Sequence, residues 1–293
     1  MTPCRTHRIG AFILAGLFGA APCAFSAALF TDVPGLSAAA QASLVAHYDG
    51  RTGVATSNVT SSDVNSWTPV DGSGTAIPSM EVTSVQRGGG AASLISYDGS
   101  GRLSFDDTAV GADGRYLAGT LSNTATVDFT VIWLGNYDAG APFATAGTYA
   151  YNIGANDISH QRDDGGGGFR VEMYNGTTYA GDDIQAYDSI DTIWSTVITV
   201  NSHTAYANGT NLNLVGTPTN SVDANAGIIM GAYSSSGYDF VGDMSQMIIF
   251  NSALSDADRL LVESYIAAIP EPSATLLLGL AALPFLRRRR SRG

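Results

Sequence analysis

The sequence contains no lysine, so all 14 of its basic residues are arginines. Its two cysteines, Cys4 and Cys23, lie in the first 23 of 293 residues. The rest of the sequence therefore offers no disulfide, no thiolate metal site and no cysteine nucleophile. Glutamate is also scarce, with 4 residues against 22 aspartates. Oxygen ligands and hydrogen-bonding groups remain as the available site chemistry.

Positive charge is nearly absent from the middle of the chain. Residues 27–269 carry 7 arginines against 25 acidic residues, a formal charge of −18. Nucleic-acid binding requires basic groups that neutralise phosphates, so this balance excludes it as a function. The same charge disfavours binding to anionic lipid, whereas calcium binding and tolerance of high salt are both compatible with it.

Residues 1–26 have the composition of a secretory signal peptide. The charged MTPCRTHR precedes an apolar run and a small-residue region ending in SAA. Cleavage after Ser26 or after Ala28 would satisfy the small-residue preference. We therefore predict an exported protein, with an uncleaved membrane anchor as the alternative.

Residues 269–293 combine a Pro-Glu-Pro tripeptide, an apolar run of 13 residues and an arginine cluster, in that order. A helix needs about 20 apolar residues to cross a bilayer, although long arginine side chains extend its reach. Arginines after the run favour a cytoplasmic C-terminus. The tripeptide is Pro270, Glu271 and Pro272, and the cluster begins with Arg287, Arg288, Arg289 and Arg290.

This arrangement resembles the PEP-CTERM sorting signal of Gram-negative bacteria. The resemblance implies a transient inner-membrane intermediate that is recognised through the Pro-Glu-Pro tripeptide by an exosortase, a membrane transpeptidase. Removal of the hydrophobic helix would then pass the protein to the cell surface or extracellular matrix. A simple C-terminal membrane anchor is the alternative.

The intervening residues 27–268 have the pattern of one β-rich domain. Short β-prone runs are separated by turn dipeptides at the spacing of a β-sandwich. The run DFTVIWLG at 128–135 is continuously apolar, as in a central strand buried on both faces. Asn208-Gly209 suits a tight hairpin, because a type I′ turn needs positive φ at both central positions.

One helix is well indicated at the C-terminal end of this domain. Ser255 is a suitable N-cap, and Asp256 and Asp258 in the first turn complement the helix dipole. The i, i+3, i+4 spacing predicts one apolar stripe that packs on the sandwich. Its members would be Ala257, Leu260, Leu261, Ser264, Tyr265 and Ala268.

The order of landmarks suggests a family. NSWTPVDGSG at Trp67, FTVIWLG, IWSTVITV at Trp194, YANGTNL, GDMSQMIIFN and ALSDADRLLVESYIA together resemble the LamG-like domains of the concanavalin A-like lectin/glucanase superfamily. The resemblance spans about residues 40–268 and is looser before Leu94, where Pro69-Val70 interrupts the usual Trp-x-Asp-Gly pattern. It implies an all-β fold: a jelly-roll sandwich of two antiparallel sheets with one short C-terminal helix.

Catalytic motifs are missing from the domain. The glucanase branch of the superfamily carries its carboxylates as Glu-x-Asp-x-x-Glu on one strand, and no glutamate here starts that pattern. A Gly-x-Ser-x-Gly elbow is also missing, and the histidines lack paired metal spacing. The glutamates of the domain are Glu81, Glu172 and Glu263, and its histidines are His47, His160 and His203. We predict no enzymatic activity and interpret the histidines as surface or strand residues.

Two pairs of aspartates are candidates for a calcium site. Ca²⁺ takes six to eight oxygen ligands, and loops at the rim of a sandwich can bring them together. The candidates are Asp163 and Asp164 in QRDDGGGG and Asp182 and Asp183 in AGDDIQ, both predicted to be loops. The alternative is that these carboxylates are solvated surface charges, since no DxDxDG loop marks the site.

Saccharide binding is the other candidate activity. Sugars stack on exposed aromatic faces while polar side chains take their hydroxyls. We place Tyr174, Tyr179, Tyr233 and Tyr238 near predicted loops, where they would form such a surface unless they are half-buried edge packing. Trp133 and Trp194 are predicted core residues.

Together these features predict an exported, exosortase-sorted protein of the cell surface or extracellular matrix. Its domain would be non-catalytic, with a structural or adhesive role in exopolysaccharide or biofilm. The alternative is a Ca²⁺-dependent carbohydrate-binding module that takes an extracellular polysaccharide. Polysaccharide hydrolysis is a third function, whose motif is missing.

Overall fold

The computed structural model describes most of the predicted domain. The described residues are 29–57, 63–86, 95–105, 114–124, 128–138, 148–154, 158–163, 170–174, 178–183, 187–199, 202–213, 225–234 and 237–269. The predicted signal peptide at 1–26 and the Pro-Glu-Pro, apolar and arginine segments at 270–293 lie outside them. So do Asp164 and the cysteines.

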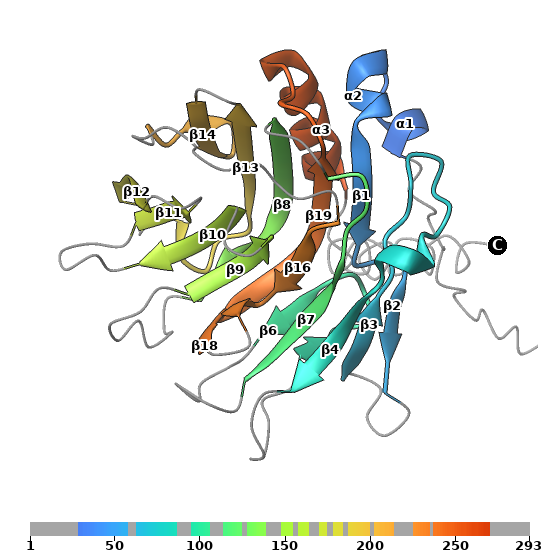
Figure 1. Ribbon diagram of the computed structural model, residues 1–293, viewed down its shortest axis with the longest axis vertical. Coiled ribbons are helices and arrows are strands. Elements are labelled where there is room, and N and C mark those ends of the chain that lie inside the picture. Colours follow the sequence, from blue (N-terminus) through green and yellow to red (C-terminus); the bar gives the residue numbers. More distant parts are fainter. Residues whose placement is uncertain are drawn as a thin grey trace, which may run out of the picture.

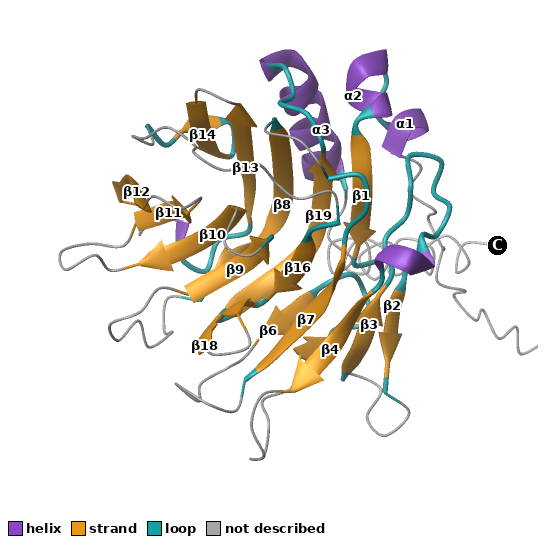
Figure 2. Cartoon of the chain, in the orientation of Figure 1, coloured by secondary structure: helices purple, strands orange, loops and turns teal. Residues whose placement is uncertain are grey.

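Two antiparallel sheets make up the described chain, which consists mainly of strands (Figure 2). The first sheet has the strand order β15-β14-β13-β8-β19-β6-β5, and β1 also pairs with β19. Its strands are β1 (Leu44–Asp49), β5 (Ile95–Tyr97), β6 (Leu103–Phe105), β8 (Phe129–Tyr137), β13 (Thr192–Thr199), β14 (Ser202–Ala207), β15 (Thr210–Asn211) and β19 (Gly242–Phe250).

The second sheet has the order β12-β11-β10-β9-β16-β7-β4-β3-β2. Its strands are β2 (Val54–Thr56), β3 (Val64–Trp67), β4 (Val82–Gln86), β7 (Arg115–Thr120), β9 (Thr148–Ile153), β10 (Ile158–Asp163), β11 (Arg170–Tyr174), β12 (Thr178–Asp183) and β16 (Gly227–Met230). A separate hairpin pairs β17 (Ala232–Ser234) with β18 (Gly237–Asp239). This all-β sandwich confirms the predicted fold class.

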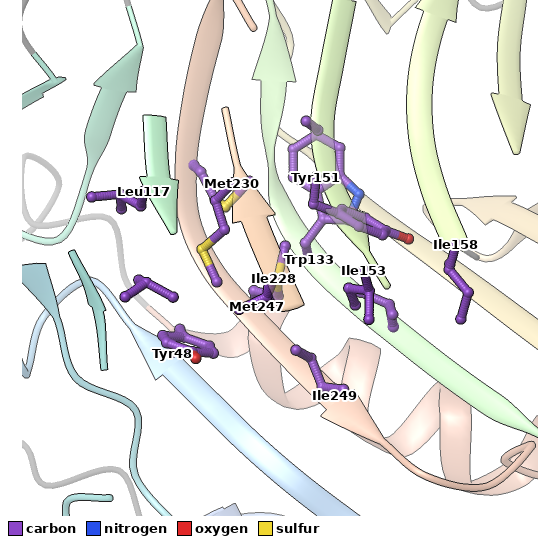
Figure 3. Packing of buried hydrophobic residues seen from close by; sticks show 14 of the residues in the cluster. Tyr48, Leu117, Trp133, Tyr151, Ile153, Ile158, Ile228, Met230, Met247 and Ile249 are labelled. Carbon is purple, nitrogen blue, oxygen red and sulfur yellow. The ribbon is translucent and has the colours of Figure 1, made fainter. Parts of the chain in front are cut away.

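The main core lies between the two sheets. Figure 3 shows Ile228, Met230 and Met247 near its centre, with Tyr48 on one side and Tyr151 on the other. The three tryptophans, Trp67, Trp133 and Trp194, are fully buried. The predicted central run is β8, where eight of nine residues are buried. The predicted hairpin also forms, because Asn208 and Gly209 both adopt positive φ between β14 and β15.

A second apolar cluster covers the outer face of the first sheet, meaning the face turned away from the second sheet. Helices α1 (Leu29–Asp32), α2 (Ala38–Ala42) and α3 (Asp256–Ala268) lie together there, at one end of β8, β19 and β1 (Figure 1). The buried members of this cluster are Leu29, Val33, Leu36, Ala40, Ile132, Ile193, Ile248, Phe250, Leu254, Val262 and Ile266. The predicted C-terminal helix is α3, and the short α1, α2 and the 3-10 turn η1 (Pro78–Met80) are present in addition to it.

The N-cap prediction for α3 is confirmed, because the Ser255 hydroxyl accepts a hydrogen bond from the N–H of Asp258. The Asp258 carboxylate in turn accepts bonds from the N–H and hydroxyl of Ser37, each at 2.9 Å, and from the Ser255 hydroxyl. Burial raises the pKa of Asp258, but these hydrogen bonds outweigh it and hold the pKa below its usual value. One carboxylate thus ties the caps of α2 and α3 together.

The predicted apolar stripe of α3 was right only in part. Leu261 and Tyr265 are half-buried and pack against the second apolar cluster. Leu260 is 46 % exposed, and Ala257, Ser264 and Ala268 are exposed as well. The buried residues of α3 are Asp258, Arg259, Val262, Glu263 and Ile266.

Charge pairing explains how the helix buries these polar residues. Arg259 donates to Glu263, which also accepts from the Ser195 hydroxyl of β13 at 2.7 Å. The Arg259 guanidinium lies 3.6 Å above the ring centroid of Tyr206 on β14. Buried charges are tolerated when they are paired, so apolar spacing alone could not reveal the face of α3 that contacts the sheet.

Among the described residues, no helix is both long and apolar enough to cross a membrane.

Candidate functional site

A polar pocket of about 370 Å³ opens on the outer face of the first sheet. Thr130 near the start of β8 lies close to α3, because its hydroxyl donates to the Ser252 carbonyl. The pocket lies at the opposite end of β8. Its polar lining residues are Arg102, Ser104, Asn136, Asp138, Ser189 and Asp243. The strands that carry the helices at one end therefore leave the other end open.

The floor of the pocket is a row of polar residues across neighbouring strands. Asp243 on β19 pairs with Ser104 on β6 and with Asn136 on β8. The Ser104 hydroxyl and the Asn136 amide, through Nδ2, both donate to the Asp243 carboxylate. Asn136 Nδ2 also donates to Asp191 Oδ1 at 2.7 Å, which extends the row to the start of β13. The sheet thus aligns groups that are far apart in the sequence.

Arg102 joins the two carboxylates of this row. Its Nη1 lies 2.9 Å from Asp243 Oδ2, and its Nη2 pairs with Asp191 Oδ2. The three side chains are about a quarter to a third exposed, so solvent screens these ion pairs and limits their contribution to stability. Their main consequence is geometric, because the guanidinium fork holds both carboxylates in fixed positions.

The turn before β6 places Arg102 in the pocket. Asp98 Oδ1 accepts hydrogen bonds from the backbone N–H groups of Ser100, Gly101 and Arg102, at 2.7, 3.0 and 3.0 Å. Burial raises the pKa of Asp98. The three backbone hydrogen bonds and a further one from the Ser100 hydroxyl lower it by more, so the pKa lies below its usual value. An ionised Asp98 therefore fixes the backbone from which Arg102 enters the strand.

Two glycines allow β8 and β19 to approach closely at the pocket. A Cβ atom on Gly135 would lie 2.0 Å from the Asp243 carbonyl oxygen. A Cβ atom on Gly242 would lie 2.1 Å from the Asn136 carbonyl oxygen. Each glycine thus immediately precedes one of the pocket residues and contacts the backbone of the other. Larger residues at either position would push the two strands apart.

The rim of the pocket contains an unusual turn at Ser189 and Ile190. Ser189 has φ of 55°, and among the described residues it is the only one other than Asn and Gly with a positive φ. Its N–H donates to the Tyr137 carbonyl at 2.7 Å. The next residue, Ile190, is 53 % exposed, the highest value among large hydrophobic side chains of the described chain. An exposed apolar side chain thus follows directly after Ser189, which lines the pocket.

Three of the four calcium candidates lie on strands, which corrects the expectation of two loops. Asp163 is the last residue of β10, and Asp182 and Asp183 end β12. The register places Asp163 and Asp183 opposite Arg170 of the intervening β11, one from each side. The described residues contain no group of three or more His, Cys, Asp or Glu side chains arranged around a metal ion. Calcium binding at these aspartates stays a prediction.

The four candidate tyrosines divide into two places. Tyr174 ends β11 and Tyr179 lies in β12, where Tyr179 pairs with Met173. Tyr233 lies in β17, and its ring centroid is 4.6 Å from that of Tyr149 on β9. Tyr238 lies on the paired strand β18. The strands thus place two of the tyrosines on β11 and β12 and two on the hairpin of β17 and β18.

All three histidines of the domain lie on strands and are buried. The Tyr137 hydroxyl and His160 Nδ1 are 2.7 Å apart in the core between the sheets. Burial lowers the pKa of His160 to about 3 and that of His203 to about 4, and His203 adds to the lowering at His160. These histidines are consequently neutral core residues at neutral pH.

Sequence reasoning missed the pocket residues, because they come from four separate parts of the chain. The available signals were local and weak. The DGSGR turn at 98–102 and the Gly-Asn and Gly-Asp dipeptides at 135–136 and 242–243 mark the elements that meet. Only the strand order shows that they meet.

No protein-family model matches the sequence, and no curated protein matches it. Solved structures resemble the fold at low identity. Domain 4 of AbnA, a GH43 extracellular arabinanase from Geobacillus stearothermophilus in complex with arabinotriose, has a TM-score of 0.44 at 15 % identity, covering 76 % of this chain and 98 % of that one. Trypanosoma rangeli sialidase in complex with sialic acid has 0.49 at 12 %, covering 78 % and 34 %.

A mutant of HCR/D has a TM-score of 0.50 at 11 % identity, covering 78 % of this chain and 53 % of that one. The chain thus spans about a third of the sialidase and about half of HCR/D. The likeness to HCR/D supports the β-sandwich fold alone.

Proposed function

We propose that this chain is an exported protein of a bacterial cell surface or extracellular matrix whose β-sandwich binds polysaccharide without cleaving it. The pocket on the outer face of the first sheet carries the binding part of the proposal. Its donors and acceptors are fixed by mutual hydrogen bonds, and the exposed apolar side chain of Ile190 follows the lining residue Ser189 in the chain. Saccharides present hydroxyl groups beside apolar C–H faces, so this combination suits them.

Binding fits the pocket better than hydrolysis does. A glycosidase needs two carboxyl groups whose oxygens are free to act on the two sides of the scissile bond. Here Asp191 and Asp243 are both paired with the Arg102 guanidinium. The pairing suits two acceptors held in place for hydroxyl groups.

A sedimentation assay tests the binding proposal. The full-length chain in detergent is mixed with a panel of insoluble polysaccharides, and bound protein and newly formed reducing ends are measured in the same samples. We expect saturable binding to at least one polysaccharide without new reducing ends. Arg102→Ala should weaken that binding about tenfold or more, because charged hydrogen bonds contribute about 1.5–3 kcal/mol.

Asp32→Asn in α1 changes the charge far from the pocket and serves as the control. If the unchanged protein forms new reducing ends and Asp191→Asn does not, the protein is a hydrolase instead. Binding to no member of the panel would overturn the proposal. Repeating the assay with Ca²⁺ and with chelator tests the Ca²⁺-dependent alternative at Asp163, Asp182 and Asp183.

Export and sorting form the second part of the proposal. They rest on the sequence features at 1–26 and 269–293, which resemble a signal peptide and an exosortase signal. In a host with an exosortase, alanine replacement of Pro270, Glu271 and Pro272 should retain the protein at the inner membrane. The unchanged chain should reach the cell surface. Equal distribution of both forms would show that the tripeptide is not the recognition element.

A further inference from the structure

We infer that one face of α3 rests on the surface of the inner membrane while the apolar run at 274–286 is inserted there. This inference rests on the proposed export and sorting, and it adds a lipid-facing surface to the domain. The face, called here the exposed face of α3, is uncharged. Its exposed members are Ala257, Leu260, Ser264, Ala267 and Ala268, and its half-buried border consists of Leu261, Tyr265 and Ile269.

The placement of charge in α3 is the first observation. A surface helix ordinarily turns its charged residues to water and its apolar residues to the core. In α3 the buried side holds Asp258, Arg259 and Glu263. The exposed side carries no charged residue after Asp256 in the first turn. The exposed face therefore suits a neighbour that does not need charged groups to contact it.

Leu260 is the main apolar residue of this face. It is 46 % exposed, and Ile190 is the one other large hydrophobic residue that is exposed in the described part of the chain. Leu261 and Tyr265, one helical turn apart, lie half-buried along one border of the face. Leucine on the apolar side of a surface helix and tyrosine at the headgroup level are both typical of contact with a membrane interface.

A short tether connects this face to the bilayer. The helix ends at Ala268 and the apolar run begins at Ala274, so residues 269–273 are all that separates them. Such a tether spans at most about 18 Å when fully extended. The headgroup layer on each side of a bilayer takes up about 5–8 Å of that distance. The last turn of α3 is therefore held close to the lipid surface whenever the apolar run is inserted.

The N-terminal end of the domain leads to the same place. Ser37 binds Asp258 near the start of α3, and a Cβ atom on Gly35 would lie 3.9 Å from Leu261 one turn later. The segment from Leu29 to Ser37 thus runs antiparallel to α3, and Figure 1 shows α1, α2 and α3 grouped at one end of the first sheet. The predicted signal peptide at 1–26 therefore joins the domain on the side where α3 ends, and it brings the same side to the membrane before its cleavage.

The charge of the domain favours this face over the rest of the surface. Residues 27–269 carry a formal charge of −18, which anionic lipids repel. An uncharged face meets the least repulsion. The contact itself need not be strong, because a short tether keeps the local concentration of the two surfaces at about the millimolar level.

Fluorescence quenching on vesicles tests the inference. In the full-length chain Cys4 and Cys23 are replaced by serine, a fluorophore is attached at Leu260→Cys, and the protein is reconstituted into phosphatidylcholine vesicles that contain a spin-labelled headgroup. We expect the fluorophore to lose roughly half of its emission or more, because an interfacial helix lies within about 5–10 Å of the boundary between headgroups and acyl chains. Thr83 is exposed on β4 of the second sheet, and packed sheets are about 10 Å apart. The same fluorophore at Thr83→Cys is therefore the control and should lose little emission.

A charge placed on the exposed face should prevent the contact. Ser264→Asp adds a carboxylate one turn from Leu260 and should reduce the quenching at position 260 to the level seen at position 83. Thr120→Asp adds the same charge at an exposed residue of the second sheet and should leave the quenching unchanged. Equal quenching at positions 260 and 83, or quenching at 260 that survives in Ser264→Asp, would overturn the inference. So would disulfide-linked dimers of unlabelled Leu260→Cys, which would assign the face to a second copy of the chain.

Flotation of the same vesicles separates the two proposals. If the chain does not float with the vesicles, residues 274–286 do not anchor it, and both the proposed inner-membrane intermediate and the contact of α3 are wrong. If the chain floats but the fluorophore at position 260 keeps its emission, the anchor stands and the contact of α3 is wrong.

Discussion

The outer face of the first sheet has two halves built on the same strands. At one end β8, β13 and β19 present Ile132, Ile193, Ile248 and Phe250 beneath α1, α2 and α3. At the other end β8 and β19 present Asn136 and Asp243 to the open pocket, and Asp191, just before β13, accepts a hydrogen bond from Asn136. Apolar side chains thus occur where helices cover the sheet, and charged side chains occur where nothing among the described residues does.

This difference indicates that the two ends of each strand have different roles, one in stability and the other in ligand binding. The covered half removes apolar surface from water and contributes to stability. The open half holds polar groups that cost stability to assemble but are available to a ligand. Substitutions in the two halves should therefore separate stability from binding, and each of the following predictions tests that separation.

The largest effect is expected in the covered half, from Phe250→Ala. Phe250 is fully buried beneath the helices, and its truncation should lower the free energy of unfolding by about 3–5 kcal/mol. Urea unfolding followed by tryptophan fluorescence measures this, because all three domain tryptophans are buried. A loss below about 1 kcal/mol would show that the helices contribute little cover.

Acid should act on the core between the two sheets, where His160 on β10 and His203 on β14 are buried. His160 and His203 have folded pKa values of about 3 and about 4, below the unfolded value near 6.5. The unfolded state therefore binds more protons below pH 6.5, and stability falls as the pH drops from about 6.5 toward 4. We expect a loss of about 3 kcal/mol from each of the two histidines in this window, at about 1.4 kcal/mol per pKa unit.

His160→Phe provides the comparison for the acid experiment. It removes the titrating group at the Tyr137 contact and should make the stability curve about half as steep between pH 6.5 and 4, because His203 still titrates. An equally steep curve in this variant would assign the acid sensitivity to other groups. Ligand binding at the outer pocket, measured at pH 7, should be the same in His160→Phe as in the unchanged protein.

An intermediate effect is expected at the junction of the two strands that form the pocket floor. Gly242→Ala would place a Cβ atom 2.1 Å from the Asn136 carbonyl oxygen, and backbone strain of this kind costs about 1–3 kcal/mol. Binding should fall with stability, since Asp243 is displaced as well. Gly99→Ala is the control for backbone conformation, because Gly99 has a φ of 77° and a Cβ there meets nothing within 4 Å, whereas Gly242 has a φ of 155°. Equal losses in both variants would attribute the effect to φ alone.

The same comparison shows what the sequence can and cannot predict. Central strand β8, the Asn208-Gly209 hairpin and the Ser255 cap were predicted, because each depends on residues close in sequence. The contact face of α3 was not, because Arg259 and Glu263 are buried through partners on β13 and β14. Apolar periodicity carries no information about such pairing.

The pocket was missed for a related reason. Asp191 and Asp243 are 52 positions apart in the sequence and meet only because β13, β8 and β19 are neighbours in the sheet. The sequence motifs that did attract attention were doublets, such as Asp182-Asp183, whose members are adjacent. Long-range strand order therefore decided the site, and single-sequence patterns do not specify strand order.

The smallest effect on stability, and the sharpest test of the division, is expected at the rim. Ile190 is 53 % exposed, so Ile190→Ser should change the free energy of unfolding by less than about 0.5 kcal/mol. The variant should nevertheless weaken saccharide binding several-fold, because the apolar contact beside the pocket is lost. Leu260→Ser on α3 is the matched control, since Leu260 is 46 % exposed in the covered half. It should leave both quantities unchanged. If the two variants behave alike in the binding assay, exposure of Ile190 has no connection with the pocket, and the open half is a surface like any other.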